Sequence, residues 1–206
     1  MFAARGYRLF FAVQALLIPA THGLVFFSIF AKRELEFDVK ALGLLLVSDA
    51  AAPLIGNAFW GRLADRAGNR TVLTGAAIAG LGAPVLALLL IWNAEILPNV
   101  LILGVFSLLV FAVNFASVGA DLASKNFILD LAPNAEKRPV YIGVNDTLVA
   151  IPTVALAGAG IIIDVFGFAP VLIGIGVCSA LAACAAWLIP RPTYTSRHQV
   201  FGMLMS

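Results

Sequence analysis

Long runs of apolar residues recur along this chain, and short polar stretches separate them. An α-helix needs about 20 apolar residues to cross the hydrocarbon core of a bilayer. Because backbone groups in lipid have no water to bond, runs of this length predict helices, and they are too long for the strands of a barrel. The pattern predicts an all-α membrane protein with six spans, at about Leu9–Phe30, Ala41–Trp60, Thr71–Trp92, Asn99–Ala120, Tyr141–Ile163 and Phe168–Pro190.

Polar residues inside these runs follow the same order twice. The first and fourth runs each carry a polar stripe at helical spacing, which puts its members on one face. These stripes are Gln14, Thr21, His22 and Ser28 in the first run and Ser107, Asn114, Ser117 and Asp121 in the fourth. The second and fifth runs each hold one carboxylate, Asp49 or Asp146, followed by a proline, and the third and sixth hold almost nothing polar.

This repeated order predicts two inverted three-helix repeats, a plan common in secondary transporters. Spans 1 and 4 would line a water-accessible cavity, because buried polar groups need partners, and spans 3 and 6 would face lipid. The cavity-lining candidates are Gln14, His22 and Asn114. For each of these three residues, a hydrogen bond between helices is an equally good interpretation.

Composition supports a membrane protein. Hydrophobic residues make up 62% of the 206 residues and charged residues 12%, about half the charged fraction of a soluble domain. Arg5 and Arg8 precede the first run, as in a signal peptide, but Leu9–Phe30 is too long for a signal core of about 7 to 15 residues. We interpret residues 1–190 as one six-helix transmembrane domain and residues 191–206 as a tail.

The distribution of basic residues predicts the orientation. With the N-terminus inside, the inner segments hold ten Lys and Arg residues and the outer segments three, namely Lys32, Arg33 and Lys40. Cytoplasmic loops carry the excess of basic residues, so we expect both termini in the cytoplasm. Tyr and Trp residues near the span ends, among them Trp60 and Trp187, would act as anchors at the membrane surface.

The charged stretch Gly61–Arg70, GRLADRAGNR, lies between the second and third runs. It resembles the signature of the major facilitator superfamily: a glycine, three residues, Asp-Arg, any residue, Gly, any residue and then a basic residue. Here these positions are filled by Gly61, Asp65, Arg66, Gly68 and Arg70. A final position that is often basic in the family holds a threonine. The segment LAPNAEKRPVYIGVNDT also resembles the second half of some bacterial members, which implies a C-terminal half and a bacterial inner membrane.

The resemblance implies a conformational latch. Gly61 would allow close helix approach, and Gly68 would allow a left-handed turn. Asp65 can face the positive N-terminal end of a neighbouring helix, for which span 5 is the natural candidate. Arg62 or Arg66 would pair with Asp121 near the cytoplasmic end of span 4. The bland alternative is a positive-inside turn with no gating role.

Full members of the family have two six-helix halves, and their substrate path runs between the halves. The resemblance therefore implies a half-unit of a secondary-active small-solute transporter that works by alternating access. Its partner would be a second copy, a separately encoded half or a larger membrane complex, besides the lipid bilayer itself. The alternative is a transporter-derived structural subunit that has lost transport. We expect no closed cavity within one copy. The sequence does not identify the substrate or the coupling ion.

The carboxylates Asp49 and Asp146 are functional candidates, because an ionisable group within a span is energetically costly and usually has a functional role. Asp146 is either a proton-coupling group or a member of the latch with Arg66 or Arg138. No cationic residue is expected on the cavity face, which disfavours a strongly anionic substrate. We expect no enzyme, no cofactor and no metal site, since the sequence offers no nucleophile-base set, no metal-ligand spacing and no phosphate-binding loop. The net charge of +2 and the lack of a basic tract disfavour nucleic acid as a partner.

Overall fold

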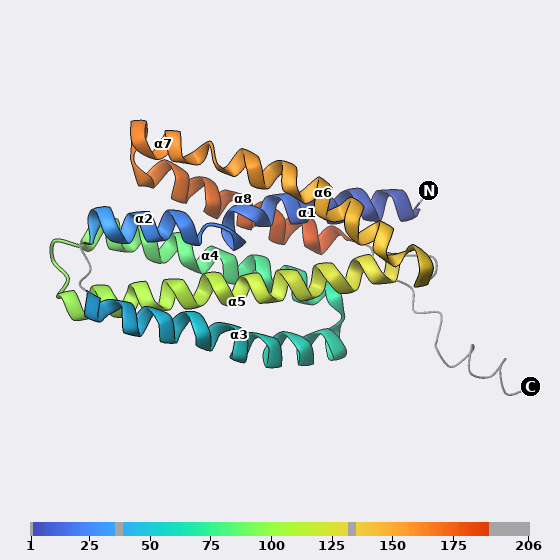
Figure 1. The fold of residues 1–206 in the computed structure, drawn as a ribbon, viewed down its shortest axis with the longest axis horizontal. Coiled ribbons are helices and arrows are strands. Elements are labelled where there is room, and N and C mark those ends of the chain that lie inside the picture. The colour runs from blue at the N-terminus through green and yellow to red at the C-terminus, as the bar shows by residue number, and fades with distance from the viewer. Residues whose placement is uncertain (1, 36–38, 132–134, 190–206) are drawn as a thin grey trace, which may run out of the picture.

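The structure, a computed structural model, describes residues 2–35, 39–131 and 135–189. The tail predicted at 191–206 lies outside the described residues. The chain forms a bundle of antiparallel helices (Figure 1). The elements are α1 Phe2–Thr21, α2 Leu24–Glu34, α3 Val39–Ala67, α4 Asn69–Asn93, α5 Asn99–Leu131, the 3₁₀ helix η1 Ala135–Lys137, α6 Arg138–Leu156, α7 Ala159–Phe166 and α8 Phe168–Leu188.

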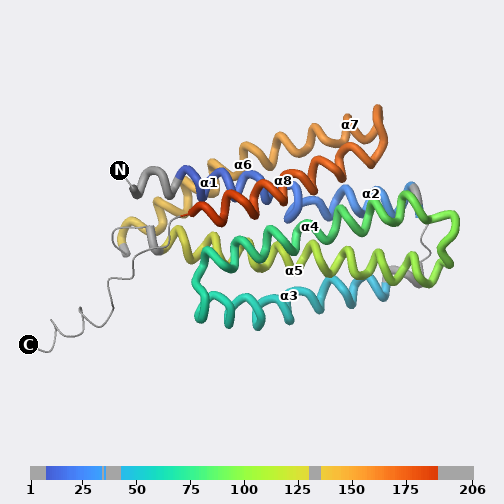
Figure 2. The backbone as a smooth tube through the Cα atoms, turned by 180° about the vertical axis from the view of Figure 1, so that it is seen from behind, coloured from blue at the N-terminus to red at the C-terminus, as the bar shows by residue number. Residues whose placement is uncertain are grey.

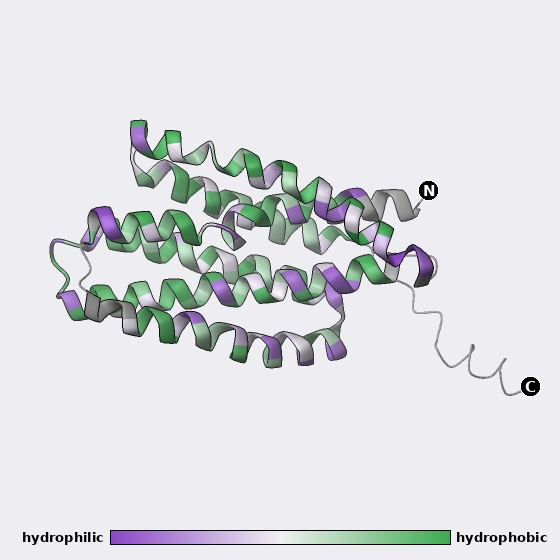
Figure 3. Cartoon of the chain, viewed as in Figure 1, coloured by the Kyte–Doolittle hydropathy of each residue, from purple (hydrophilic) through white to green (hydrophobic). Residues whose placement is uncertain are grey.

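The six predicted spans are confirmed by length and composition. They are Arg8–Arg33, Gly43–Ala67, Asn69–Asn93, Asn99–Leu129, Arg138–Phe166 and Phe168–Leu188. Large apolar side chains remain exposed on many helices, for example Leu54, Val100 and Ile161, and apolar residues predominate along the helices in Figure 3. Lipid is the solvent that such a surface requires, since soluble monomers seldom expose large apolar patches.

Helix packing follows the predicted inverted repeat. If the first three spans are exchanged for the last three, the α4–α5 contact maps onto α1–α8, and the α3–α5 contact maps onto α1–α6. The α4–α8 and α1–α5 contacts each map onto themselves. Apolar residues fill two core clusters along the bundle, one centred on residues such as Phe27 and Phe106 and the other on residues such as Phe10 and Leu73.

The expectation that spans 3 and 6 face lipid is wrong for one side of each helix. Helices α4 and α8 pack side by side in the centre of the bundle (Figure 2). Small residues such as Ala76 and Gly80 allow this close approach, and an added Cβ on Gly80 would lie 3.6 Å from the Oγ of Ser179 on α8. The span Arg138–Phe166 is the least enclosed, with 6% of its apolar window buried against 39% for α4.

Two spans contain a break that the apolar pattern did not predict. The first span is interrupted at His22 and Gly23, between α1 and α2, where a Cβ on Gly23 would lie 2.4 Å from the carbonyl oxygen of Pro19. The fifth span is interrupted at Ala157 and Gly158, where the backbone bonds tighten to the i→i+3 type. Each break follows a proline within the span, Pro19 or Pro152, which weakens the local helix. The two breaks, in spans 1 and 5, are not related by the inverted repeat, because the repeat pairs span 1 with span 4.

The signature stretch is helical rather than a turn. Helix α3 continues to Ala67, and α4 begins at Asn69, so that Gly68 alone separates them. Residues such as Leu63 and Ala64 favour the helix, whereas Gly68 adopts φ 82° and ψ 164°, a region essentially restricted to glycine. This junction lies at the same end of the bundle as the N-terminus and the start of α6 (Figure 1).

Trp60 is not a membrane-surface anchor. Only 2% of it is exposed, and its Nε1 donates a hydrogen bond to the carbonyl oxygen of Phe115 on α5 at 2.8 Å. Gly75 and Gly119 leave room for its ring, since an added Cβ would lie 2.9 Å and 2.7 Å from ring atoms, respectively. The indole therefore joins α3 to α4 and α5 just before the signature stretch.

Candidate functional site

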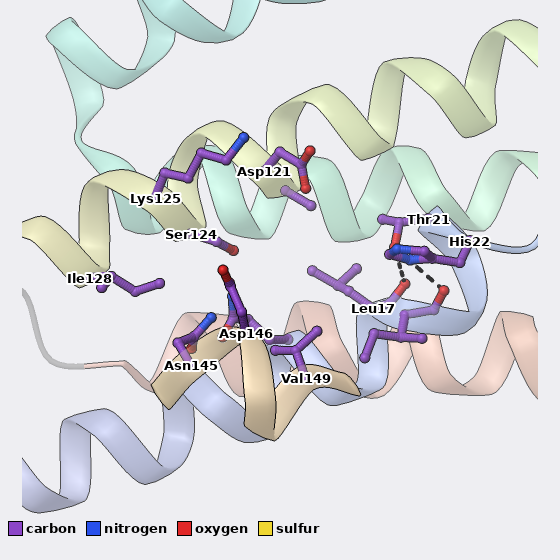
Figure 4. Close-up of a pocket in the computed structure, with 13 residues that line it drawn as sticks. Leu17, Thr21, His22, Asp121, Ser124, Lys125, Ile128, Asn145, Asp146 and Val149 are labelled. Carbon is purple, nitrogen blue, oxygen red and sulfur yellow. Dashed lines mark hydrogen bonds between the residues drawn. The ribbon is translucent and has the colours of Figure 1, made fainter. Parts of the chain in front are cut away.

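A polar pocket of about 180 Å³ lies between α1, α5 and α6 (Figure 4). These three helices belong to spans 1, 4 and 5, and the polar stripes of spans 1 and 4 both contribute to it. Its polar lining consists of Gln14 and Thr21 from α1, His22 from the break after α1, Asp121, Ser124 and Lys125 from α5, and Asn145 and Asp146 from α6. Apolar residues such as Leu17, Ile128 and Val149 complete the wall.

The end of α1 positions one side of the pocket. Thr21 donates its hydroxyl hydrogen to the carbonyl oxygen of Leu17 at 3.1 Å, and its Oγ1 lies 3.0 Å from Nδ1 of His22. The tautomer of the His22 ring sets which of the two atoms, Thr21 Oγ1 or His22 Nδ1, donates in this contact. The Ser117 hydroxyl of α5 lies 3.0 Å from the carbonyl oxygen of Thr21, which ties the break in span 1 to α5.

The pocket wall contains polar atoms without partners. Asn145 is only 3% exposed, and its Oδ1 has no hydrogen bond. The Oε1 of Gln14 is buried in the same way. Asp121 and Asp146 are exposed, and within the part of the chain that the structure describes neither forms an ion pair. In Figure 4, Asp146 points from α6 toward Ser124 on α5.

The structure separates the sequence-predicted residues into two groups. Gln14 and His22 line the pocket, as expected for cavity residues, together with Asp121 and Asp146. Asn114 does not line it. Its Nδ2 donates to Oδ1 of Asp49 at 2.9 Å, so that these two candidates form a bond between α5 and α3. Both intramembrane carboxylates are exposed in the isolated chain, which places them at the bundle surface rather than in its core.

The expected contacts of the latch are not formed in this structure. Arg62, Asp65 and Arg66 are exposed, and none of them makes a hydrogen bond or ion pair with a described residue. Asp121 lies on the pocket wall instead. Gly61 has open space at its Cβ position, so that no helix approaches it. Gly68 has a positive φ, but its ψ of 164° is extended and not that of the expected left-handed turn.

Arg70 has a contact that sequence reasoning missed. Its guanidinium donates to the carbonyl oxygen of Trp187 near the end of α8 and lies 5.8 Å from the centre of that indole ring. Cation–π geometry of this kind stabilises the pair. Beside it, Nδ2 of Asn126 on α5 donates to Oδ1 of Asn69 at 3.2 Å. The last part of the signature therefore fastens the start of α4 to α5 and α8.

A second contact missed from the sequence joins the two helices that follow the breaks in the first and fifth spans. Arg33 of α2 pairs with Asp164 of α7 at 2.9 Å. Both side chains are more than half exposed, so that the pair contributes little stability on its own. Its position is more informative, since it links the two helices that lie beyond the breaks.

Lys125, Ser124 and Asn145 were also not selected from the sequence. Lys125 follows Asp121 by one helical turn on α5, and Asn145 directly precedes Asp146. The spacing of Lys125 from Asp121 and of Asn145 from Asp146 could have identified both residues. The presence of Lys125 on the wall contradicts the expectation of a cavity face without cations. No group of three or more His, Cys, Asp or Glu residues suited to a metal ion occurs within residues 2–35, 39–131 and 135–189.

Comparison with protein families gives one match. The family model described as Major Facilitator Superfamily matches residues 9–202. Comparison with curated proteins and comparison with solved structures each give no match. The family match covers all six spans and the signature stretch.

Proposed function

The chain belongs to the major facilitator superfamily, and we propose that it is one half-unit of a secondary-active transporter for a small solute. The family consists of transporters rather than enzymes, and the chain is an integral multi-pass membrane protein. The observation that carries the proposal is the polar pocket between α1, α5 and α6. Alternating access would expose this pocket first to one side of the membrane and then to the other.

A second membrane half completes the proposed path. Carboxylates such as Asp121 and Asp146 would be costly against lipid, as would the bonded pair of Asp49 and Asn114. A second copy of this chain, a separate half or a larger membrane complex would cover them. Helix α3 and the span Arg138–Phe166 are the least enclosed, and they are therefore the natural surfaces for that contact.

The signature stretch acts as a latch in this proposal. Asp65, Arg62 and Arg66 are exposed at the end of α3 and free to pair in another conformation. Asp121, the partner expected for the arginines, would leave the pocket wall as the latch closes. Opening and closing of this contact would couple pocket access to the relative position of the two halves.

The end of the bundle that carries the signature stretch Gly61–Arg70 would lie in the cytoplasm. The described basic residues Arg62, Arg66, Arg70, Lys137 and Arg138 gather there, and such an excess is typical of the cytoplasmic side. Both termini would then be cytoplasmic. The sequence resemblance to bacterial members supports an inner-membrane location.

The test begins with the native assembly. The chain is purified in mild detergent, its accompanying proteins are identified, and the assembly is placed in liposomes for uptake of a panel of labelled small solutes. Asp65→Asn should slow uptake, whereas Glu95→Gln, an exposed carboxylate beyond α4 at the other end of the bundle, should not. Absence of flux with every partner found would refute the transport function, and flux that Asp65→Asn leaves unchanged would refute the latch.

A structural subunit is the remaining alternative. It predicts that the partner seals spans 1 and 4 with a close-packed wall and leaves no water-filled gap. A structure of the assembly distinguishes the two, because a transporter half requires the pocket between α1, α5 and α6 to remain hydrated.

A further inference from the structure

The pocket between α1, α5 and α6 contains buried hydrogen-bond acceptors that no described residue satisfies. The buried Oδ1 of Asn145 and the buried Oε1 of Gln14 accept no hydrogen bond. The carboxylates of Asp121 and Asp146 line the same space, and no described residue donates to them. A buried acceptor without a donor destabilises the structure that contains it. A ligand that supplies several N–H donors and no acceptor would satisfy these oxygens.

Charge points to the same class of ligand. Asp121 and Asp146 carry two negative charges when ionised, and Lys125 supplies one positive charge. His22 is the other titratable side chain on the wall, and its neutral form adds no charge. One negative charge is therefore uncompensated, and it becomes costly once a partner half excludes water from the pocket. A ligand with one positive charge would restore balance.

We infer that this pocket binds the ammonium group of a small organic cation. An ammonium group has three N–H donors and no acceptor, and its single charge balances the wall. The volume of about 180 Å³ equals that of about six water molecules, which exceeds the need of a bare metal ion and suits a short aliphatic amine. That such a cation is also the transported solute rests on the proposed function, whereas its binding does not.

A thiol placed in the pocket reports the electrostatic potential of the pocket through its reaction rates with charged reagents. It also reports ligand binding, because a bound ligand protects it from reaction. The native Cys178 and Cys184 lie on α8, outside the pocket lining, and are replaced by alanine. Val149→Cys then puts one thiol on the wall contributed by α6. In the purified assembly, its reaction rates with a cationic and an anionic methanethiosulfonate of similar size are compared. Propylammonium, 1-propanol, propionate and sodium are each added at equal concentration as protecting probes.

The cationic reagent should react faster, and Asp121→Asn or Asp146→Asn should lower the ratio of the two rates by at least about tenfold, the change expected for one charge about 6 Å away even in bulk water. The control Glu95→Gln should leave the ratio unchanged. Propylammonium should slow the reaction, and 1-propanol and propionate should not. The conservative variant Asp146→Glu should retain this protection, which separates a charge effect from misfolding.

Three results would each overturn the inference: an unchanged rate ratio in both Asn variants, protection by 1-propanol equal to that by propylammonium, or equal protection by sodium. If the Asn variants do not elute as folded particles, the comparison of probes on the intact pocket decides alone. Failure here is distinct from failure of the transport function. If the assembly transports other solutes but propylammonium does not protect the thiol, the transport function stands and only the proposed ligand class is refuted.

Discussion

Alanine at Gly119 should force α3 and α5 apart at the buried indole of Trp60. A Cβ at this position would lie 2.7 Å from Cε2 and 2.9 Å from Nε1 of the ring. Ordinary van der Waals contact begins at 3.4 Å, so that the ring would have to move by about 0.7 Å. It has little space to do so, because it is 2% exposed and its centre lies 4.8 Å from that of Phe115.

The energetic consequences can be estimated term by term. Overpacking of this kind costs about 1–3 kcal/mol. Movement of the ring also strains the 2.8 Å bond from Nε1 to the carbonyl oxygen of Phe115, worth about 1 kcal/mol. Replacing a helical glycine by alanine returns about 0.5–1 kcal/mol. We therefore expect Gly119→Ala to lower the free energy of unfolding by about 1–3 kcal/mol.

Gly104 provides the matched control, since it lies in the same helix and a Cβ there meets nothing within 4 Å. Gly104→Ala should be stabilising by about 0.5–1 kcal/mol. Both variants are melted in mild detergent and followed by helical circular dichroism. The midpoint should fall by about 3–10 °C for Gly119→Ala and rise by about 1–3 °C for Gly104→Ala. A Gly119→Ala protein that melts at or above the wild type would refute the packing argument.

Three further predictions concern other contacts. Gly68→Ala should cost about 1–3 kcal/mol, because φ 82° and ψ 164° suit glycine alone; an unchanged melting midpoint would contradict this conformation. Exchanging the charges of Arg33 and Asp164 should restore the stability that either reversal alone lowers by about 0.2–1 kcal/mol, and a double-mutant cycle with no coupling would argue against the pair. Removing Asn114 and Asp49 separately and together should give a coupling energy of about 0.6–1.7 kcal/mol, and strictly additive losses would contradict their bond.

Helix positions were predictable because the signal is long and strongly periodic. Runs such as Thr71–Trp92 and Asn99–Ala120 exceed the thickness of the bilayer core and permit one interpretation. The repeat was predictable too, since the polar stripes occur in the same order twice. The helix breaks were not, because Pro53 and Pro84 lie inside unbroken helices whereas Pro19 and Pro152 precede breaks. Local sequence alone does not distinguish these outcomes.

The site was predicted in part. Stripe residues such as Gln14 and His22 could be selected from the sequence, because a polar side chain is costly in lipid and therefore marks a face that lipid does not contact. For Asn114, a hydrogen bond between helices was one of the two interpretations, and the structure shows that bond. Its partner Asp49 was not predicted, because a pattern gives the face of a residue and not its partner on the next helix. The contact of Arg70 with Trp187 joins residues 117 positions apart, and no spacing rule connects them. Trp60 was misjudged for the same reason, since its burial depends on Gly75 and Gly119 in other helices.

The central claim is that this half-unit opens its pocket to each side of the membrane in turn, and side-specific labelling of Val149→Cys in the cysteine-free background tests it most directly. A membrane-impermeant thiol reagent is applied to intact cells and to inverted vesicles. We expect labelling from both sides, with the ratio of the two labelling rates shifted by Asp65→Asn and unaffected by Glu95→Gln. Labelling from a single side in all variants, with no response to Asp65→Asn, would contradict it.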